Sequence, residues 1–220
     1  MCKIFVIEGP DYSGKTTLIN RLCKYFKSNG KRVAIFKEPS GEIREMLLDK
    51  DGNLPFATRR CLFAADHFQT LDSIYKVRDN YDYIFMDRST VISDLVYAPS
   101  EIDSDYAFFK MSELTREQFL LIDSIEYDSF FMCNTHLILL RLPKQELLNR
   151  MYSRAINSND IFDIKSDDFK ILIWQKYNEL IDSLMNHSSS NIQKIFNSIS
   201  SIEVDDNILE NTRRLIEGDK

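Results

Sequence analysis

The sequence predicts a three-layer α/β/α fold, in which helices cover both faces of a mainly parallel, five-stranded sheet. Short apolar segments of strand length alternate with longer segments of helical periodicity. The first two strands are joined by a helix and a short return, and such a crossover is right-handed and makes its strands parallel. Ligands of such sheets bind beyond the carboxyl ends of the strands, so we expect the functional residues at that edge.

The individual elements follow from hydrophobic periodicity and from the turn residues between them. We expect strands at 4–8, 32–36, 83–86, 136–142 and 195–203, and helices at 16–29, 43–48, 57–78, 115–124, 143–154, 169–185 and 208–216. Residues 93–111 are expected to be less regular, with a break at Pro99. Residues 157–168 are rich in Asn, Asp and Ser, which is typical of a mobile segment. The whole chain, 1–220, is expected to form one domain.

Composition excludes several classes of protein. The formal net charge of −6 argues against a general nucleic-acid surface, because phosphodiesters call for clustered Lys and Arg. The four cysteines are far apart in the sequence, which suggests neither a zinc site nor a disulfide framework and favours a reduced compartment. The sequence contains no signal-peptide pattern and no apolar run of membrane-spanning length. A cytoplasmic protein is therefore expected.

The first strand leads into a phosphate-binding loop. Gly9, Gly14, Lys15 and Thr16 fill the G-x-x-x-x-G-K-[ST] spacing between a predicted strand and a predicted helix. Backbone N–H groups of such a loop and the positive end of the helix face the phosphates of a nucleotide. Lys15 adds a charge, and the Thr16 hydroxyl is placed to bind Mg²⁺. We expect the phosphate-binding set to include, besides these four, Tyr12, Ser13 and Thr17.

A second motif ends the third predicted strand, which we expect beside the first. Asp87 can hold Mg²⁺, possibly through water, and the adjacent Arg88 can bind a second phosphate in a bidentate fork. The alternative is a solvated charge pair in a turn. Together with the loop, this motif predicts a fold of the P-loop NTPase type.

Several further motifs follow in a characteristic order: Glu-Gly-Pro-Asp-Tyr-Ser-Gly-Lys-Thr-Thr at 8–17, Lys-Glu-Pro-Ser-Gly at 37–41, Ile-Arg-Glu-Met-Leu-Leu at 43–48, Leu-Phe-Ala-Ala-Asp at 62–66, and a helix carrying Arg150 and Arg154. With these motifs the chain resembles the thymidylate kinases, within the nucleoside monophosphate kinase group, over nearly its full length. The resemblance implies transfer of the γ-phosphoryl group of ATP to dTMP, with Mg²⁺ as cofactor. It also implies a homodimer, for which the long helix at 57–78 is the candidate surface.

The resemblance also implies roles for individual residues. Asp11 is similar to the loop carboxylate that family members use near the sugar hydroxyl and phosphate of the acceptor. Arg88 and Arg44 resemble the residues around the acceptor phosphate, and Phe63 resembles the ring on which the pyrimidine stacks, with a place in the helix core as its alternative role. Glu38 belongs to the same acceptor-binding set.

A mobile lid is expected at about 150–168. Position 12 is Tyr, so an arginine that some family members carry in the loop is absent, and the resemblance then implies that the lid supplies the catalytic cation. Arg150 and Arg154 are four residues apart and share a helix face. We assign Arg154 to catalysis and Arg150 to a place nearer the adenine. A pair of merely exposed arginines is the alternative.

Three positions depart from the family pattern. His67 stands where an arginine usually reads the thymine edge, and imidazole cannot reproduce a guanidinium fork. Ser89 replaces a common aromatic, and Tyr97 replaces a common glutamine, while Ser93 still fits the pocket serine. We expect His67 to take over the arginine function, with a preference for dTMP or another pyrimidine.

Two other functions stay open on the sequence alone. Asp87-Arg88-Ser89 also resembles the deoxynucleoside kinases, in which Glu38 would act as a base toward a 5′-hydroxyl. A regulatory protein that binds a nucleotide without transferring phosphate is the other alternative. Such a protein would be expected to lack some of the residues Asp11, Lys15, Thr16 and Arg88, all of which are present.

Overall fold

The computed structural model describes residues 2–47, 54–101, 134–154, 166–186 and 196–218. The helix predicted at 115–124 lies outside these residues. So does most of the predicted lid, of which the structure describes only 150–154 and 166–168.

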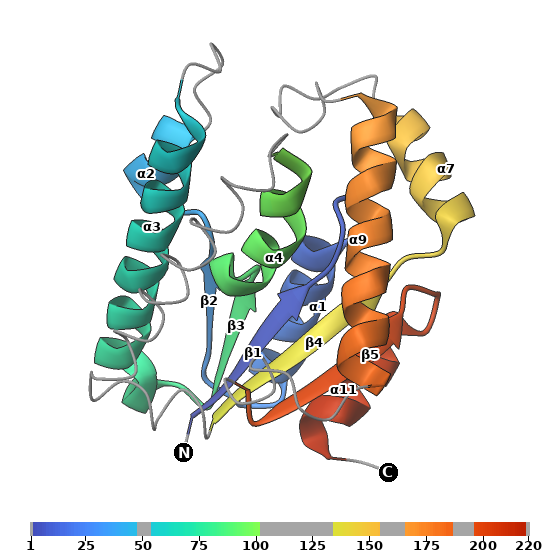
Figure 1. The fold of residues 1–220 in the computed structure, drawn as a ribbon. Helices are drawn as coiled ribbons and strands as arrows, with labels where there is room; N and C mark the ends of the chain where they lie inside the picture. Colours follow the sequence, from blue (N-terminus) through green and yellow to red (C-terminus); the bar gives the residue numbers. More distant parts are fainter. Residues whose placement is uncertain (1, 48–53, 102–133, 155–165, 187–195, 219–220) are drawn as a thin grey trace.

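The centre of the molecule is a five-stranded sheet in which every pairing is parallel, as the sequence predicts. Its strands lie in the order β2-β3-β1-β4-β5 (Figure 1). They span Lys3–Glu8 (β1), Val33–Lys37 (β2), Tyr83–Asp87 (β3), Thr135–Arg141 (β4) and Ser198–Glu203 (β5). The central strand β1 therefore has β3 on one side and β4 on the other. The register places Ile7 beside Asp87, so the phosphate loop and the Asp-Arg motif leave the sheet next to each other.

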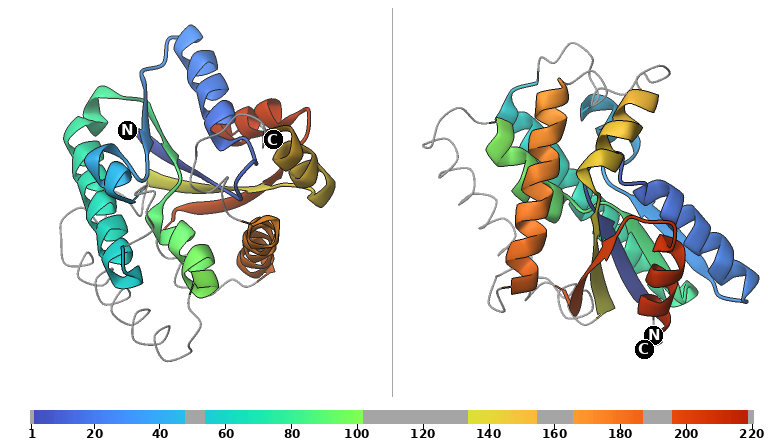
Figure 2. Two further views of the ribbon diagram at one scale, coloured as in Figure 1. Left: turned by 90° about the horizontal axis from the view of Figure 1, so that it is seen from above. Right: turned by 90° about the vertical axis from the view of Figure 1, so that its right-hand side faces the viewer.

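Helices cover both faces of the sheet, which gives the predicted three layers (Figure 2). Their bounds are Lys15–Ser28 (α1), Gly41–Leu47 (α2), Phe56–Val77 (α3), Thr90–Glu101 (α4), Lys144–Arg154 (α7), Asp167–Asn186 (α9) and Ile208–Glu217 (α11), and a 3-10 turn at Arg78–Asn80 follows α3. In the left view of Figure 2, α1, α7 and α11 lie on one side of the sheet, and α3, α4 and α9 lie on the other.

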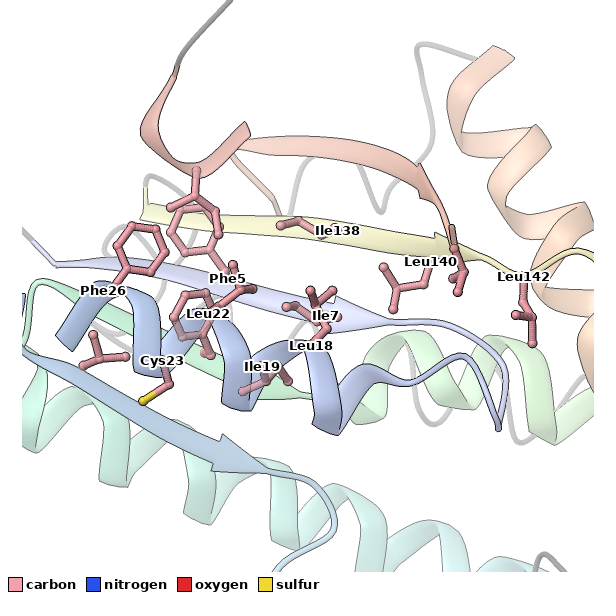
Figure 3. Close-up of a cluster of buried hydrophobic side chains, with 14 of the residues drawn as sticks. Phe5, Ile7, Leu18, Ile19, Leu22, Cys23, Phe26, Ile138, Leu140 and Leu142 are labelled. Atoms are coloured by element: carbon pink, nitrogen blue, oxygen red, sulfur yellow. The ribbon is translucent and has the colours of Figure 1, made fainter. Parts of the chain in front are cut away.

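Two buried cores result from the alternation of side chains along the strands. From β1, Phe5 and Ile7 face the core beneath α1, whereas Ile4 and Val6 face the core beneath α4 and α9. Figure 3 shows the first core, in which side chains of α1 pack against β1 and β4. Full burial of one such aliphatic or aromatic side chain contributes about 1.5–3 kcal/mol. The cores hold β1 and α1 rigidly, and these two elements carry the loop between them.

The prediction of a break at Pro99 is wrong, because α4 continues through this position to Glu101. A proline inside a helix removes one backbone hydrogen bond and crowds the carbonyl four residues earlier. Packing outweighs that cost here, since Ile92 and Val96 of α4 are buried in the core that α4 shares with α9.

None of the helices that the structure describes is both long and apolar enough to cross a bilayer.

Candidate functional site

The loop between β1 and α1 needs glycine at both glycine positions of its motif, 9 and 14. A Cβ on Gly9 would lie 2.9 Å from the backbone oxygen of Leu140 on β4, closer than real contacts allow. Gly14 has φ 84° immediately before α1, in the left-handed region that favours glycine. These two glycines let the loop pass close to β4 and then turn into α1. The free backbone N–H groups at the start of α1 are the kind that bind phosphate.

Lys15 lies folded against the loop that it follows. Its Nζ donates to the backbone oxygens of Gly9 and Pro10, both at 2.8 Å, and to Ser13 Oγ at 3.4 Å. Burial, and then the nearby charge of Arg88, lowers the pKa of Lys15 to about 8. The surroundings thus disfavour the charged form of Lys15, and anionic phosphates bound beside it would favour that form again.

The hydroxyl group of Thr16 on α1 contacts the carboxylate of Asp87 at the end of β3. Thr16 Oγ1 donates to Asp87 Oδ2 at 2.5 Å, and Lys37 Nζ lies 4.0 Å from the same oxygen. Hydroxyl and carboxylate oxygens suit Mg²⁺, which keeps several waters and takes further ligands from substrate phosphates. The described residues contain no group of three or more His, Cys, Asp and Glu side chains arranged for a metal. The pair fits a magnesium ion that is shared with a nucleotide, but not a dedicated protein cage.

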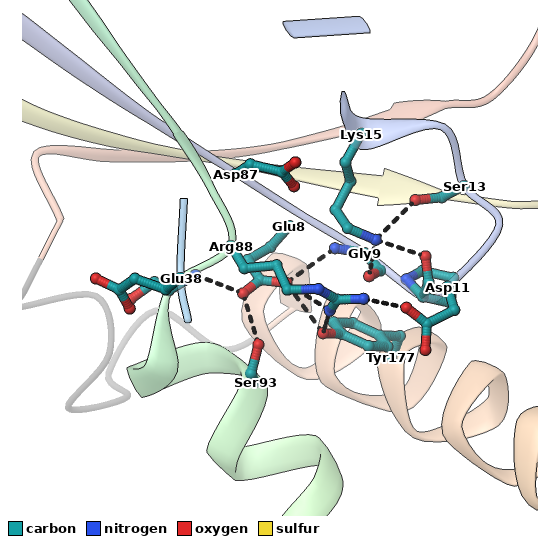
Figure 4. Close-up of polar contacts among 12 residues, drawn as sticks. Glu8, Gly9, Asp11, Ser13, Lys15, Glu38, Asp87, Arg88, Ser93 and Tyr177 are labelled. Atoms are coloured by element: carbon teal, nitrogen blue, oxygen red, sulfur yellow. Dashed lines mark hydrogen bonds and ion pairs between the residues drawn. The ribbon is translucent and has the colours of Figure 1, made fainter. Parts of the chain in front are cut away.

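Arg88 follows Asp87 with an unusual backbone, since its φ is 77°. Its guanidinium donates to Asp11 on the loop and, at 3.1 Å, to the hydroxyl of Tyr177 on α9. Burial alone would lower the pKa of Arg88, but Tyr97, Asp11 and other neighbours raise it well above its usual value. The structure therefore brings a permanent cation to the loop residue Asp11 (Figure 4).

Asp11 has a second partner from α4. The hydroxyl of Tyr97 donates to Asp11 Oδ2 at 2.9 Å, and the Tyr97 ring lies 5.9 Å from the Arg88 guanidinium carbon. Burial raises the pKa of Tyr97, and the Asp11 charge raises it further, so the hydroxyl keeps its proton. Asp11, Arg88 and Tyr97, three of the predicted site residues, thus form one contact cluster.

Glu8, the last residue of β1, is a functional candidate that the sequence reasoning missed. Its side chain is completely buried. Oε1 accepts from Ser89 N at 2.7 Å and from Ser93 Oγ at 3.0 Å. Oε2 accepts from Gly9 N at 3.1 Å and from the hydroxyl of Tyr177 at 2.9 Å. Figure 4 shows this carboxylate between the loop, α4 and α9.

Of the two residues Glu8 and Tyr177, only Glu8 could have been found from the sequence. An acidic residue that ends an otherwise apolar strand, directly before a phosphate loop, is out of place unless it has buried partners. Tyr177 gave no such signal, because an aromatic residue on the apolar face of a helix is usually a core residue.

The predicted base-reading residue His67 is engaged with Glu38. His67 Nδ1 lies 2.9 Å from Glu38 Oε1 and 3.0 Å from Oε2, and both side chains are buried. Glu38 Oε2 also accepts from Thr90 N at 2.7 Å. Burial alone would lower the pKa of His67, but the charge and hydrogen bond of Glu38, together with Asp66, raise it. The Nδ1 side of the ring therefore faces the protein.

Three other residues, Arg44, Phe63 and Ser93, are predicted to bind the nucleotide that accepts the phosphoryl group. Arg44 is on α2 and Phe63 is on α3, and both are half-buried. Ser93 donates to Glu8 rather than pointing freely into a pocket.

Arg150 reaches the loop from α7. Its Nη1 donates to Tyr12 O at 2.9 Å, its Nε donates to Glu146 at 2.6 Å, and Nη1 lies 3.4 Å from where a Cβ on Gly14 would be. A small pocket opens beside this contact, between α7 and α9, and is lined by Asp11, Tyr12, Leu147, Phe169, Lys170 and Ile173. Arg154 ends α7, and its side chain, like residues 155–165, lies outside what the structure describes.

The fold and this site define a class of protein. A phosphate-binding loop between β1 and α1, with an Asp-Arg pair at the end of the adjacent β3, is the arrangement of P-loop proteins that bind nucleotides. A sequence profile described as Thymidylate kinase matches residues 7–199, and the chain belongs to that family.

Individual relatives are similar to different extents. A thymidylate kinase of Caldicellulosiruptor saccharolyticus is 23% identical over 223 residues, which cover 98% of this chain and 96% of that protein. One of Thermosipho africanus is 40% identical over 74 residues, which cover 31% of this chain and 37% of that protein. One of a Sulfurihydrogenibium species is 36% identical over 105 residues, covering 45% and 52%. The matches to these last two thus span less than two thirds of the relatives' own length.

Proposed function

We propose that this protein is a thymidylate kinase that transfers the γ-phosphoryl group of ATP to dTMP and forms dTDP and ADP. The observation that carries the proposal is the direct contact between Arg88 and Asp11. Arg88 follows β3, and Asp11 lies in the loop after the neighbouring strand β1. In this proposal Arg88 would bind phosphate, and the donor and acceptor phosphates would meet beside this contact. Membership of the thymidylate kinase family supports the choice of acceptor.

In this proposal the loop holds ATP. The backbone from Gly9 to Gly14 and the start of α1 would bind the phosphates, with Lys15 as the charge at the outer phosphates. Tyr12, Ser13 and Thr17 complete this set. The contact of Arg150 with Tyr12 O supports a place for Arg150 on the ATP side of the loop.

Magnesium would be held by Thr16 and, directly or through water, by Asp87. It would supply charge neutralisation between the phosphates. The 2.5 Å contact between the two side chains supports this assignment, because both oxygens already lie at one point beside the loop.

The acceptor would lie on the other side, against α3 and α4. Arg88 and Arg44 would bind its phosphate, Asp11 and Tyr97 would face its sugar, and Phe63 would stack on its base. Among the described residues, Phe63 is absent from both buried cores, which favours stacking over a core role. Ser93, His67 and Glu38 would shape the pocket behind these groups.

Catalysis would come from alignment and charge rather than from a base. The attacking phosphate oxygen of dTMP is already ionised, so no proton has to be removed. Arg88, Lys15 and Arg154 would neutralise the charge that spreads over the moving phosphoryl group.

The deoxynucleoside kinase alternative is disfavoured by the partners of Glu38. Both of its oxygens contact His67, and one also accepts from Thr90 N. A general base needs a free oxygen within reach of the hydroxyl that it deprotonates. The regulatory alternative is disfavoured because Asp11, Lys15, Thr16 and Arg88 are all engaged in the same site.

We also propose a homodimer in the cytoplasm. Phe68, which is 39% exposed on α3, supports a contact surface on that helix. The described cysteines Cys2, Cys23 and Cys61 are free thiols, which suits a reducing compartment. A solution mass of twice that of the chain, measured by light scattering, tests the dimer.

A comparison of two acceptors separates the kinase alternatives. With Mg-ATP we expect ADP release and dTDP formation in the presence of dTMP, and none above background with thymidine. Phosphorylation of thymidine but not of dTMP would make the protein a nucleoside kinase.

A further inference from the structure

We propose that Glu8 and Tyr177 form a buried relay that positions Arg88 for the acceptor phosphate. The inference rests on the proposed function and adds two positioning residues to it. Neither residue is expected to touch a substrate.

The first step is the burial of Glu8. A carboxylate that is removed from water is strongly disfavoured unless charges and hydrogen bonds compensate the lost hydration. Here all four hydrogen-bonding partners are donors, as an ionised carboxylate requires, and Arg88 Nη1 lies 3.8 Å from Oε2. The donors come from the loop, the start of α4, and α9. Glu8 therefore fixes three segments of the site relative to one another.

The second step is the direction of the Tyr177 hydroxyl. A phenol has one proton, and here the hydroxyl oxygen lies 2.9 Å from Glu8 Oε2 and 3.1 Å from Arg88 Nη1. Because arginine can only donate, the hydroxyl must accept from Arg88 and give its own proton to Glu8. Glu8 thereby sets the direction of Tyr177, and Tyr177 holds one edge of the guanidinium (Figure 4).

The third step is the difference between the two carboxylates around Arg88. The Asp11 side chain is 30% exposed on the loop, whereas that of Glu8 is fully buried. A bound acceptor can compete for Arg88 at the Asp11 side but cannot displace Glu8. The relay thus keeps Arg88 in place when its contact with Asp11 is exchanged for a substrate.

The test begins with Glu8→Gln and Tyr177→Phe, which preserve side-chain size. Because small misplacements of catalytic groups cost up to about 100-fold, we expect kcat for dTMP to fall about 10–100-fold in Glu8→Gln and about 5–20-fold in Tyr177→Phe. The KM for ATP should change less than about twofold in both, since the loop still binds. Tyr25→Phe, which removes a surface hydroxyl 3.4 Å from Glu217, is the matched control and should keep wild-type kcat.

A double-mutant cycle then separates positioning from plain stability. If the relay acts through Arg88, Tyr177→Phe should lower the rate of dTDP formation less than about twofold in an Arg88→Ala background. An equal fold-loss in both backgrounds overturns the relay. If Glu8→Gln does not fold, the cycle with Tyr177→Phe decides alone. Absence of dTMP phosphorylation in the wild type would instead refute the proposed function.

Discussion

At the scale of single residues, the site is built from charges that are held out of water. Lys15, Arg88, Glu8 and Glu38 each have hydrogen-bonding or ionic partners that compensate their burial.

The lowered pKa of Lys15 predicts proton uptake when ATP binds. With a pKa of about 8, Lys15 is partly neutral near pH 8, and the charge of the phosphates should restore its proton. ATP affinity should therefore weaken as the pH rises from 7 to 9. Calorimetry in buffers of different ionisation enthalpy should detect the proton uptake near pH 8. Lys15→Arg, whose guanidinium does not titrate in this range, is the control, and the same proton uptake in that variant would contradict the assignment.

The raised pKa of His67 predicts a pH-dependent contribution to stability. A histidine whose pKa rises above 6.5 on folding stabilises the protein fully below pH 6.5 and loses this effect as the pH passes its raised pKa. Because it breaks a buried pair, His67→Gln should lower the free energy of unfolding by about 3–5 kcal/mol at pH 6 and by clearly less at pH 9.

Urea denaturation at the two pH values measures this difference. His136→Gln is the matched control, because burial lowers the pKa of His136 instead of raising it. An equal loss of stability at pH 6 and pH 9 in His67→Gln would rule out a charged His67–Glu38 pair.

At the scale of elements, the sequence predicted what depends on local pattern. The expected strands and the helices flanking the loop agree with the structure to within a few residues, because their apolar periodicity reflects the two faces of the sheet. The break predicted at Pro99 failed because tertiary packing of α4 overrides a local preference.

The polar contacts between distant residues were harder to predict, because they depend on how the helices pack on the sheet. Phosphate-loop residues are close in sequence, so their spacing already defines the site. Glu8 and Tyr177 are 169 positions apart, and their contact depends on how α9 lies across the sheet. The His67–Glu38 pair depends likewise on how α3 packs beside the end of β2. No sequence pattern encodes these distances.

Helix α7 carries two arginines, Arg150 and Arg154, with different predicted roles. Arg150 contacts the loop at Tyr12 O, so Arg150→Ala should raise the KM for ATP several-fold with a smaller effect on kcat. Arg154→Ala should do the reverse and lower turnover far more than ATP affinity, because it would act on the transition state. Steady-state kinetics of both variants with ATP as the varied substrate gives the comparison. Unchanged turnover in Arg154→Ala would remove it from catalysis.

At the scale of the whole molecule, the parallel sheet explains why the site forms where it does. Three strands, β1, β2 and β3, end at the same edge and deliver the loop, Glu38 and the Asp-Arg pair to one place. Helices α4, α7 and α9 then add Tyr97, Arg150 and Tyr177 from outside the sheet. Donor and acceptor would thus meet between rigid elements, which is what an in-line phosphoryl transfer requires.

The measurement that tests this account most directly is the choice of acceptor. Wild-type protein with Mg-ATP would be given dTMP, dUMP, dCMP, dGMP and AMP in parallel reactions, and the diphosphate products would be separated by chromatography. The account predicts that dTMP is phosphorylated with the highest kcat/KM and that removal of magnesium abolishes the reaction. A higher kcat/KM for any of the other monophosphates, or no diphosphate from any acceptor, would contradict it.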